Sequence, residues 1–336
     1  MMAAFEITAW HYAGFVGAIL IFLALDLGVF HKKAHVVSFK EAMGWTTLWV
    51  SLAGVFAFAW VRPKLGHDSA LLFISGYLTE LSLSMDNVFV IALIFTYFKV
   101  PTPYQHRVLF WGILGALIMR GVMIWAGVEL IRHFHWSLYF FGAFLVFTGI
   151  KMLFADEDGV HPDSNPAVQL VRRFFPVSPD FDGAKFTTLT STGKRVLTPL
   201  AVVLIMVEST DLVFAVDSIP AIFGLTTDPF IVFTSNAFAI LGLRSLYFVL
   251  AGAIAYFKYL KIGLSLVLVF IGVKMLIAPH GGKEAGAKKL WFQIEISSAL
   301  SLSIVAGILI LAILGSVVAA RIRPSGSRPS PDDTQS

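Results

Sequence analysis

The sequence contains no cysteine and few charged residues. None of its 336 residues is Cys, and only 14% are Asp, Glu, Lys or Arg. The missing cysteine excludes disulfides, thiolate metal sites and thiol redox chemistry. Soluble domains carry about 25% charged residues, so this shortage argues against an ordinary soluble domain.

Apolar residues dominate the composition. They make up 57% of the chain, and the mean hydropathy is +0.80. The apolar residues occur in long runs, and such runs are typical of transmembrane helices. The sequence therefore predicts an all-α, polytopic membrane protein with about nine transmembrane helices, near 9–30, 43–61, 70–97, 107–131, 137–154, 198–222, 230–256, 261–278 and 290–320.

Basic residues are unevenly distributed between the predicted loops. With the N-terminus outside, the inner loops and tail hold fifteen Lys and Arg and the outer loops six, while four lie within spans. The positive-inside rule therefore predicts an outer N-terminus and an inner C-terminus. The net charge of +4 belongs to these loops and does not indicate nucleic-acid binding. The first apolar run lacks a preceding basic segment and is expected to be a retained helix.

A pair of carboxylates occurs twice within the apolar runs, each time six residues apart. The first copy is Glu80-Leu-Ser-Leu-Ser-Met-Asp86-Asn87, and the second is Asp211-Leu-Val-Phe-Ala-Val-Asp217-Ser218. Placing a charged carboxylate at the centre of a membrane helix costs about 2.5–3.5 kcal/mol on insertion scales. Such residues therefore indicate an ion or proton pathway.

Helical geometry separates the two acids of each pair. Six residues correspond to about 240° of rotation, so Glu80 and Asp86 do not share a face of a straight helix. Glu80, Ser84 and Asn87 do share one, as do Asp211 and Ser218. Either the two acid positions face different neighbours, or the helix is broken and both turn inward. Pro220 favours a break in the second copy, and a plain kink is the alternative.

The acid motif belongs to a longer repeat. Leu145-Val-Phe-Thr-Gly-Ile-Lys-Met-Leu153 matches Leu268-Val-Phe-Ile-Gly-Val-Lys-Met-Leu276, and each half has one arginine within a span, Arg120 or Arg244. Three spans per copy require the second copy to enter from the opposite face, as in the inverted repeats of secondary transporters. The predicted parts are two helices in 1–66, a three-helix repeat in 67–155, a cytoplasmic loop in 156–197 with a short surface helix near 167–175, the inverted repeat in 198–280, the last helix in 281–322, and a disordered tail in 323–336.

The polar groups inside the spans are oxygen donors. Carboxylates and amide or hydroxyl oxygens suit Mn²⁺, Mg²⁺ or Ca²⁺, whereas all nine histidines fall in loops or at span ends. Asp86 and Asp217 are expected to be central ligands because they hold matching places. An empty carboxylate cluster should hold protons, so metal binding should release them. The expected metal ligands are Glu80, Asp86, Asn87, Glu208, Asp211, Asp217 and Ser218.

The arginines within the spans need acidic partners or a polar cavity. One interpretation of Arg120 and Arg244 is a structural ion pair. The other is that the guanidinium neutralises an acid and swings away when a metal binds. Together with Asn236, they are the candidates for gating or charge compensation.

These motifs, together with Thr227-Asp-Pro-Phe-Ile-Val-Phe-Thr-Ser-Asn236 and Gly242-Leu-Arg244-Ser-Leu-Tyr, resemble the TerC/Alx family of integral membrane proteins. The resemblance runs from about Asp26 to about Met275. It implies a nine-span fold related to lysine-exporter-type transporters, a place in the bacterial inner membrane, and export of Mn²⁺ as substrate with no prosthetic group.

Three classes of function stay open at this point. The first is a Mn²⁺ exporter that exchanges protons, whose partners are the metal ion, protons and membrane lipid. The second is a membrane scaffold or metal-loading partner for secreted proteins, linked to tellurite or alkaline stress and acting beside secretion machinery or as a homo-oligomer. The third is an intramembrane enzyme, which the repeat symmetry and the missing Tyr-Asp and Gly-x-Gly-Asp signatures disfavour.

Overall fold

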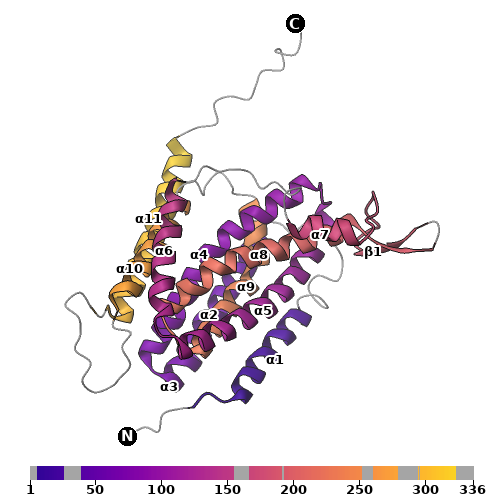
Figure 1. Ribbon diagram of the computed structural model, residues 1–336. Coiled ribbons are helices and arrows are strands. Elements are labelled where there is room, and N and C mark those ends of the chain that lie inside the picture. Colours follow the sequence, from indigo (N-terminus) through magenta and orange to yellow (C-terminus); the bar gives the residue numbers. More distant parts are fainter. Residues whose placement is uncertain are drawn as a thin grey trace.

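The protein is a bundle of long helices lying side by side (Figure 1). The structure, a computed structural model, describes residues 6–25, 39–154, 166–190, 193–251, 260–278, 294 and 296–322. Its elements are α1 (Ala9–Leu25), α2 (Phe39–Val55), the π-helical turn η2 (Phe56–Val61), α3 (Arg62–Leu65), α4 (His67–Tyr97), α5 (Thr102–His133), α6 (Ser137–Phe154), α7 (Pro166–Phe174), β1 (Thr187–Leu189), β2 (Arg195–Leu197), α8 (Pro199–Phe223), α9 (Pro229–Ala251), α10 (Leu260–Ile277) and α11 (Ser298–Ile322).

The long helices have the composition of membrane spans. Within the described ranges, seven helices are long and apolar enough to cross a membrane, and α1 is an apolar helix of shorter length. The predicted all-α membrane class is confirmed. The count of nine spans and the inverted repeat stay predictions, and the predicted tail (323–336) lies outside the described residues.

The expected break at Pro220 is not present. α8 runs without interruption from Pro199 to Phe223 with Pro220 inside it. Proline removes one backbone donor and is costly mainly in the middle of a helix. Pro220 lies in the last turn, where its own carbonyl accepts a bond from the Gly224 N–H at 3.0 Å. Of the two alternatives that the sequence leaves open at Pro220, the break is therefore wrong.

α9 is the central helix of the bundle. In its apolar stretch, 89% of the residues are buried. α4 packs along α9, and α5 packs along both α8 and α9. The acid-bearing helices α4 and α8 are therefore each paired with an arginine-bearing helix from the other predicted half.

α6 and α10 form a close seam through small residues. A Cβ on Gly149 would lie 2.9 Å from the Ser265 carbonyl oxygen, and a Cβ on Gly272 would lie 2.7 Å from the Gly142 carbonyl oxygen. Gly149 and Gly272 are matching positions of the sequence repeat, and so are Gly142 and Ser265. Each contact thus has a counterpart with the two helices exchanged, which is the pattern that a two-fold pseudo-axis between them would produce.

The long loop between α6 and α8 is folded where it is described. The predicted short helix is present as α7, whose Val168 is buried against the core. β1 and β2, which the sequence did not predict, form an antiparallel pair. Beside them, hydrogen bonds from Thr188 and Lys185 hold the pKa of Asp182 below its usual value. α7 and this hairpin lie together at one end of the bundle (Figure 1).

Candidate functional site

The guanidinium of Arg120 is the centre of the candidate site. Arg120 lies on α5 and is only 1% exposed. Its Nη1 forms an ion pair with Glu80 Oε1 of α4. Its Nη2 donates to Asp211 Oδ1 of α8 at 3.0 Å, and its Nε donates to Asp211 Oδ2 at 3.3 Å. One cationic group thus joins two carboxylates from two different helices.

Three polar side chains complete this cluster. Asn87 Nδ2 donates to Asp211 Oδ1 at 3.0 Å, and Arg120 Nη1 donates to Ser218 Oγ at 3.3 Å. Ser84 Oγ lies 3.5 Å from Glu80 Oε1. The two predicted helix faces, one with Glu80, Ser84 and Asn87 and one with Asp211 and Ser218, therefore meet at the arginine.

Two oxygens of the cluster have no donor. Glu80 Oε2 and Asn87 Oδ1 are both buried, and neither has a hydrogen-bond partner in the described part of the chain. A buried acceptor without a partner costs about 1–3 kcal/mol, so such atoms call for a physical explanation, of which a bound ion or water is one. The cluster therefore has unused capacity to coordinate a cation.

Asp86 and Asp217 lie beside this cluster and face a cavity, in keeping with the rotation of about 240°. They line a cavity of about 60 Å³ that Arg120 and Ser218 also line. We call it the Asp86–Asp217 cavity. The Thr148 side chain of α6 is a hydrogen-bonding neighbour of Asp217.

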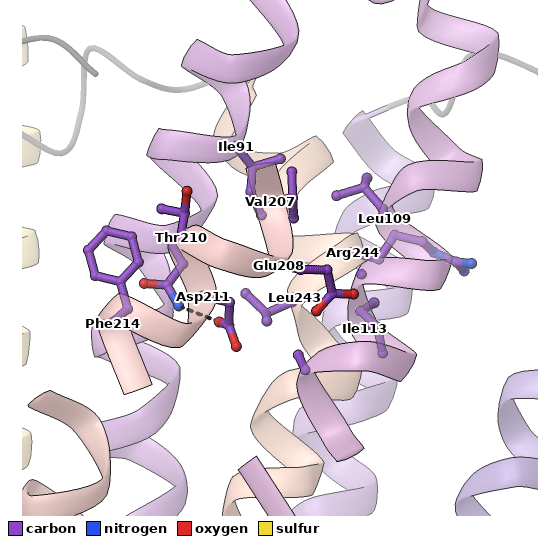
Figure 2. A pocket seen from close by; sticks show the side chains of 13 residues that line it. Ile91, Leu109, Ile113, Val207, Glu208, Thr210, Asp211, Phe214, Leu243 and Arg244 are labelled. Atoms are coloured by element: carbon purple, nitrogen blue, oxygen red, sulfur yellow. Dashed lines mark hydrogen bonds between the residues drawn. The ribbon is translucent and has the colours of Figure 1, made fainter. Parts of the chain in front are cut away.

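Glu208 lines a second, separate cavity of about 30 Å³, together with Asn87, Asp211 and Arg244. Figure 2 shows Glu208 and Asp211 of α8 among the residues of this Glu208 cavity, with a dashed line for the bond between Asn87 and Asp211. A Cβ on Gly115 of α5 would overlap the Glu208 carboxylate. The missing side chain of Gly115 is therefore what gives this carboxylate its space against α5.

The second arginine and Asn236 have other surroundings. Arg244 Nη1 donates to His106 Nε2 at 3.2 Å, at the start of α5. Next to this pair, Tyr247 donates to Gln105 at 3.0 Å. Both amide atoms of Asn236 are buried without a hydrogen-bond partner among the described residues.

The predicted ligands do not form a single coordination shell. No group of three or more His, Cys, Asp or Glu poised to hold a metal ion occurs within the residues that the structure describes. Instead, the structure distributes the predicted residues over the Arg120 cluster and the two cavities. Arg120 holds together the cluster that is named after it, and it also lines the Asp86–Asp217 cavity.

Sequence reasoning missed three residues that shape these places. His106 lies at the end of a predicted span, and Thr148 and Gly115 belong to neither acid motif. Only the glycine carried a signal, since Gly112 and Gly115 stand three apart near the start of a predicted span. Spacing alone could not connect it to an acid on another helix.

Comparison with known sequences then decides the family. The profile of the integral membrane protein TerC family matches residues 65–323. This protein belongs to the TerC family. The site residues from Glu80 to Arg244 all lie within the matched range, and the resemblance noted in the sequence motifs is confirmed.

Full-length relatives resemble this TerC-family protein over nearly their whole length. The uncharacterized membrane protein STKORF319 of Myxococcus xanthus is 50% identical over 95% of this chain and 96% of its own. Alx of Escherichia coli K12 is 45% identical over 89% of this chain and 92% of its own. Its full name proposes a role as a membrane-bound redox modulator. A Rickettsia bellii membrane protein is 39% identical over 92% and 97%. No solved structure matches the chain.

Proposed function

We propose that this protein is a secondary transporter that exports Mn²⁺, or a similar hard divalent cation, from the cytoplasm in exchange for protons. The cation would cross between the two predicted halves, with Glu80 and Asp211 as its first carboxylate ligands. The protein would act as a carrier and not as an enzyme.

The observation that carries this proposal is the pair of buried carboxylates on Arg120. Glu80 and Asp211 converge from α4 and α8 on one positive group. When both are ionised they bear two negative charges, which a divalent cation would neutralise fully and a single guanidinium would neutralise by half. The free Glu80 Oε2 and Asn87 Oδ1 offer further oxygen ligands at the same place.

The chemistry of these donors favours a hard cation. Carboxylate, amide and hydroxyl oxygens bind Mn²⁺, Mg²⁺ and Ca²⁺, whereas softer metals favour thiolate and imidazole. The chain has no cysteine, and its nine histidines fall outside the acid motifs. Among hard cations, the family resemblance of the acid motifs favours Mn²⁺. The missing cysteine also argues against a thiol-based redox role for this chain.

The seam between α6 and α10 supports transport between two halves. The reciprocal contacts of Gly149 and Gly272 on α6 and α10 fit an inverted repeat. Inverted repeats place the substrate near the middle of the membrane, between the halves. We infer a place in the bacterial inner membrane, with the N-terminus outside and the C-terminus in the cytoplasm, because this orientation puts most basic residues inside.

The test is Mn²⁺ flux into liposomes that contain the purified protein. Glu80→Gln and Asp211→Asn keep the shape of the side chains and remove their charges. Each should reduce flux at least tenfold, because a buried divalent cation without its counter-charge is strongly disfavoured. The matched control is Glu129→Gln near the end of α5, where the carboxylate pairs with Arg132 at 2.9 Å on the protein surface.

Glu129→Gln should transport as the wild type does. Wild-type flux in both buried variants, with protein present in the membrane at normal amounts, would sink the proposal. A second measurement uses cells: deletion of the gene should raise cellular manganese and lower tolerance to added Mn²⁺. Unchanged manganese in a strain without another exporter would also contradict it.

A further inference from the structure

We propose that Arg120 is a tethered cation that exchanges places with the transported ion: when the divalent cation binds Glu80 and Asp211, the guanidinium moves to Asp86 and Asp217. This inference rests on the proposed function and adds a role for the arginine and for the second pair of acids. It starts from the position of Arg120, which contacts one pair and lines the cavity of the other.

The guanidinium and the ion compete for one site. Arg120 bonds to Glu80 through Nη1 and to both carboxylate oxygens of Asp211 through Nη2 and Nε. An ion coordinated by these same oxygens would occupy the space of the guanidinium. Binding of the ion therefore requires that the arginine leave.

A displaced arginine needs another acidic partner. Arginine stays protonated in proteins, so it cannot shed its charge in a low-dielectric interior. Leaving a buried charge without its partner costs about 3–5 kcal/mol. The Glu208 cavity does not include Arg120 in its lining, whereas the other cavity does. The available acids are therefore Asp86 and Asp217.

The path of the guanidinium from the pair Glu80 and Asp211 to the pair Asp86 and Asp217 is short. Arg120 Nη1, the atom that pairs with Glu80, also donates to Ser218 Oγ at 3.3 Å. Ser218 follows Asp217 directly and lines the same cavity. A change in the side-chain torsions of Arg120 would bring the guanidinium from one acid pair to the other, with Ser218 as an acceptor on the way.

The charges around the cavity fit this exchange. Asp86 and Asp217 belong to different helices, so together they offer two carboxylates to one guanidinium. The nearby cations are Lys261 for Asp86 and Lys151 for Asp217. Lys151 is exposed and its ammonium can turn toward the membrane surface, as lysines near helix ends do. With Lys151 turned away, the two carboxylates and Lys261 leave one negative charge uncompensated. The arginine can neutralise that charge while the ion neutralises the first pair.

The exchange predicts a specific coupling between residues. If Asp86 and Asp217 receive the arginine, they matter for ion binding only while Arg120 is present. If they are direct ligands of the ion, they matter with or without it. A double-mutant cycle separates these cases, because it measures whether one change removes the effect of another.

The experiment measures Mn²⁺ binding to purified protein through the electron paramagnetic resonance signal of free Mn²⁺. Four proteins are compared: wild type, Arg120→Gln, Asp86→Asn with Asp217→Asn, and all three changes together. Arg120→Gln should bind Mn²⁺ about tenfold more tightly, since no internal cation competes. The double Asp variant should bind about tenfold more weakly than wild type, and in the Arg120→Gln background it should change affinity less than twofold.

Each other outcome has a definite meaning. An equal loss in both backgrounds would make the two aspartates ligands and overturn the exchange. No loss in either background would also overturn it, because the arginine would then need no second pair. Wild-type protein that binds no Mn²⁺ at all would contradict the proposed function instead.

A measurement on the unchanged protein covers the case in which Arg120→Gln does not fold. A crystal structure of wild type with saturating Mn²⁺, recorded at the manganese edge, should place the metal between Glu80 and Asp211. The guanidinium should then contact Asp86 and Asp217. Metal found elsewhere, with Arg120 still on Glu80 and Asp211, would overturn the exchange.

Discussion

Replacing Gly115 by alanine should impair transport while leaving the fold intact. A Cβ at this position overlaps the carboxylate of Glu208, which forms the flexible end of its side chain. Non-bonded carbon and oxygen atoms prefer separations near 3.5 Å, so the carboxylate must move by roughly 1 Å or more. The backbone of α5 and α8 can stay in place.

The effect on stability should be small because two terms oppose each other. Alanine is about 1 kcal/mol more favourable than glycine inside a helix. Moving the Glu208 side chain away from its preferred rotamer costs about 0.5–1.5 kcal/mol. We therefore expect a melting temperature close to that of the wild type.

The effect on Mn²⁺ flux should be large, at least about tenfold, because small misplacements of positioned groups are costly. Gly112→Ala on the same helix is the control, since its Cβ would lie 3.4 Å from Val207 Cγ1, an ordinary contact. It receives the same gain in helix propensity and should transport normally. Combining Gly115→Ala with Glu208→Gln should reduce flux no further than either change alone. Wild-type flux in Gly115→Ala would show that the place of Glu208 against α5 does not matter.

Two other predictions follow from the seam and from the proposed coupling. Gly272→Ala should destabilise the protein by about 1–3 kcal/mol, as overpacking does, because its Cβ would lie 2.7 Å from the Gly142 carbonyl oxygen and α6 and α10 must separate. Gly307→Ala is the control and should not destabilise the protein, because a Cβ there would meet no atom within 4 Å. Equal melting temperatures for Gly272→Ala and Gly307→Ala would refute the close seam. In liposomes with an internal pH dye, Mn²⁺ flux should be matched by proton movement in the opposite direction. Flux without any pH change across a range of external pH would rule out proton exchange and favour an electrogenic uniport.

Local periodicity predicted part of this structure correctly. The faces that carry Glu80, Ser84 and Asn87, and Asp211 and Ser218, follow from 3.6 residues per turn, and the structure places both against Arg120. Periodicity within one helix depends only on the backbone of that helix. This is why the separation of each acid pair could be derived before any packing was known.

The partners across helices could not be derived in this way. The repeat suggests equal roles for the two arginines, yet Arg120 contacts both Glu80 and Asp211, and Arg244 contacts His106. Which acid an arginine meets depends on the relative shift and rotation of packed helices. Those quantities result from the fit of many side chains, and no motif of a few residues contains them.

The seam between α6 and α10 has a consequence for how the chain assembles during synthesis. Gly149 and Gly272 are 123 residues apart, so α6 is made long before the helix that covers its small residues. At about 5–20 residues per second, the interval is roughly 6–25 s. Throughout that time α6 must remain in the membrane with this surface against lipid or a chaperone. The final shape of the first half is therefore set only when the second half has been translated and inserted.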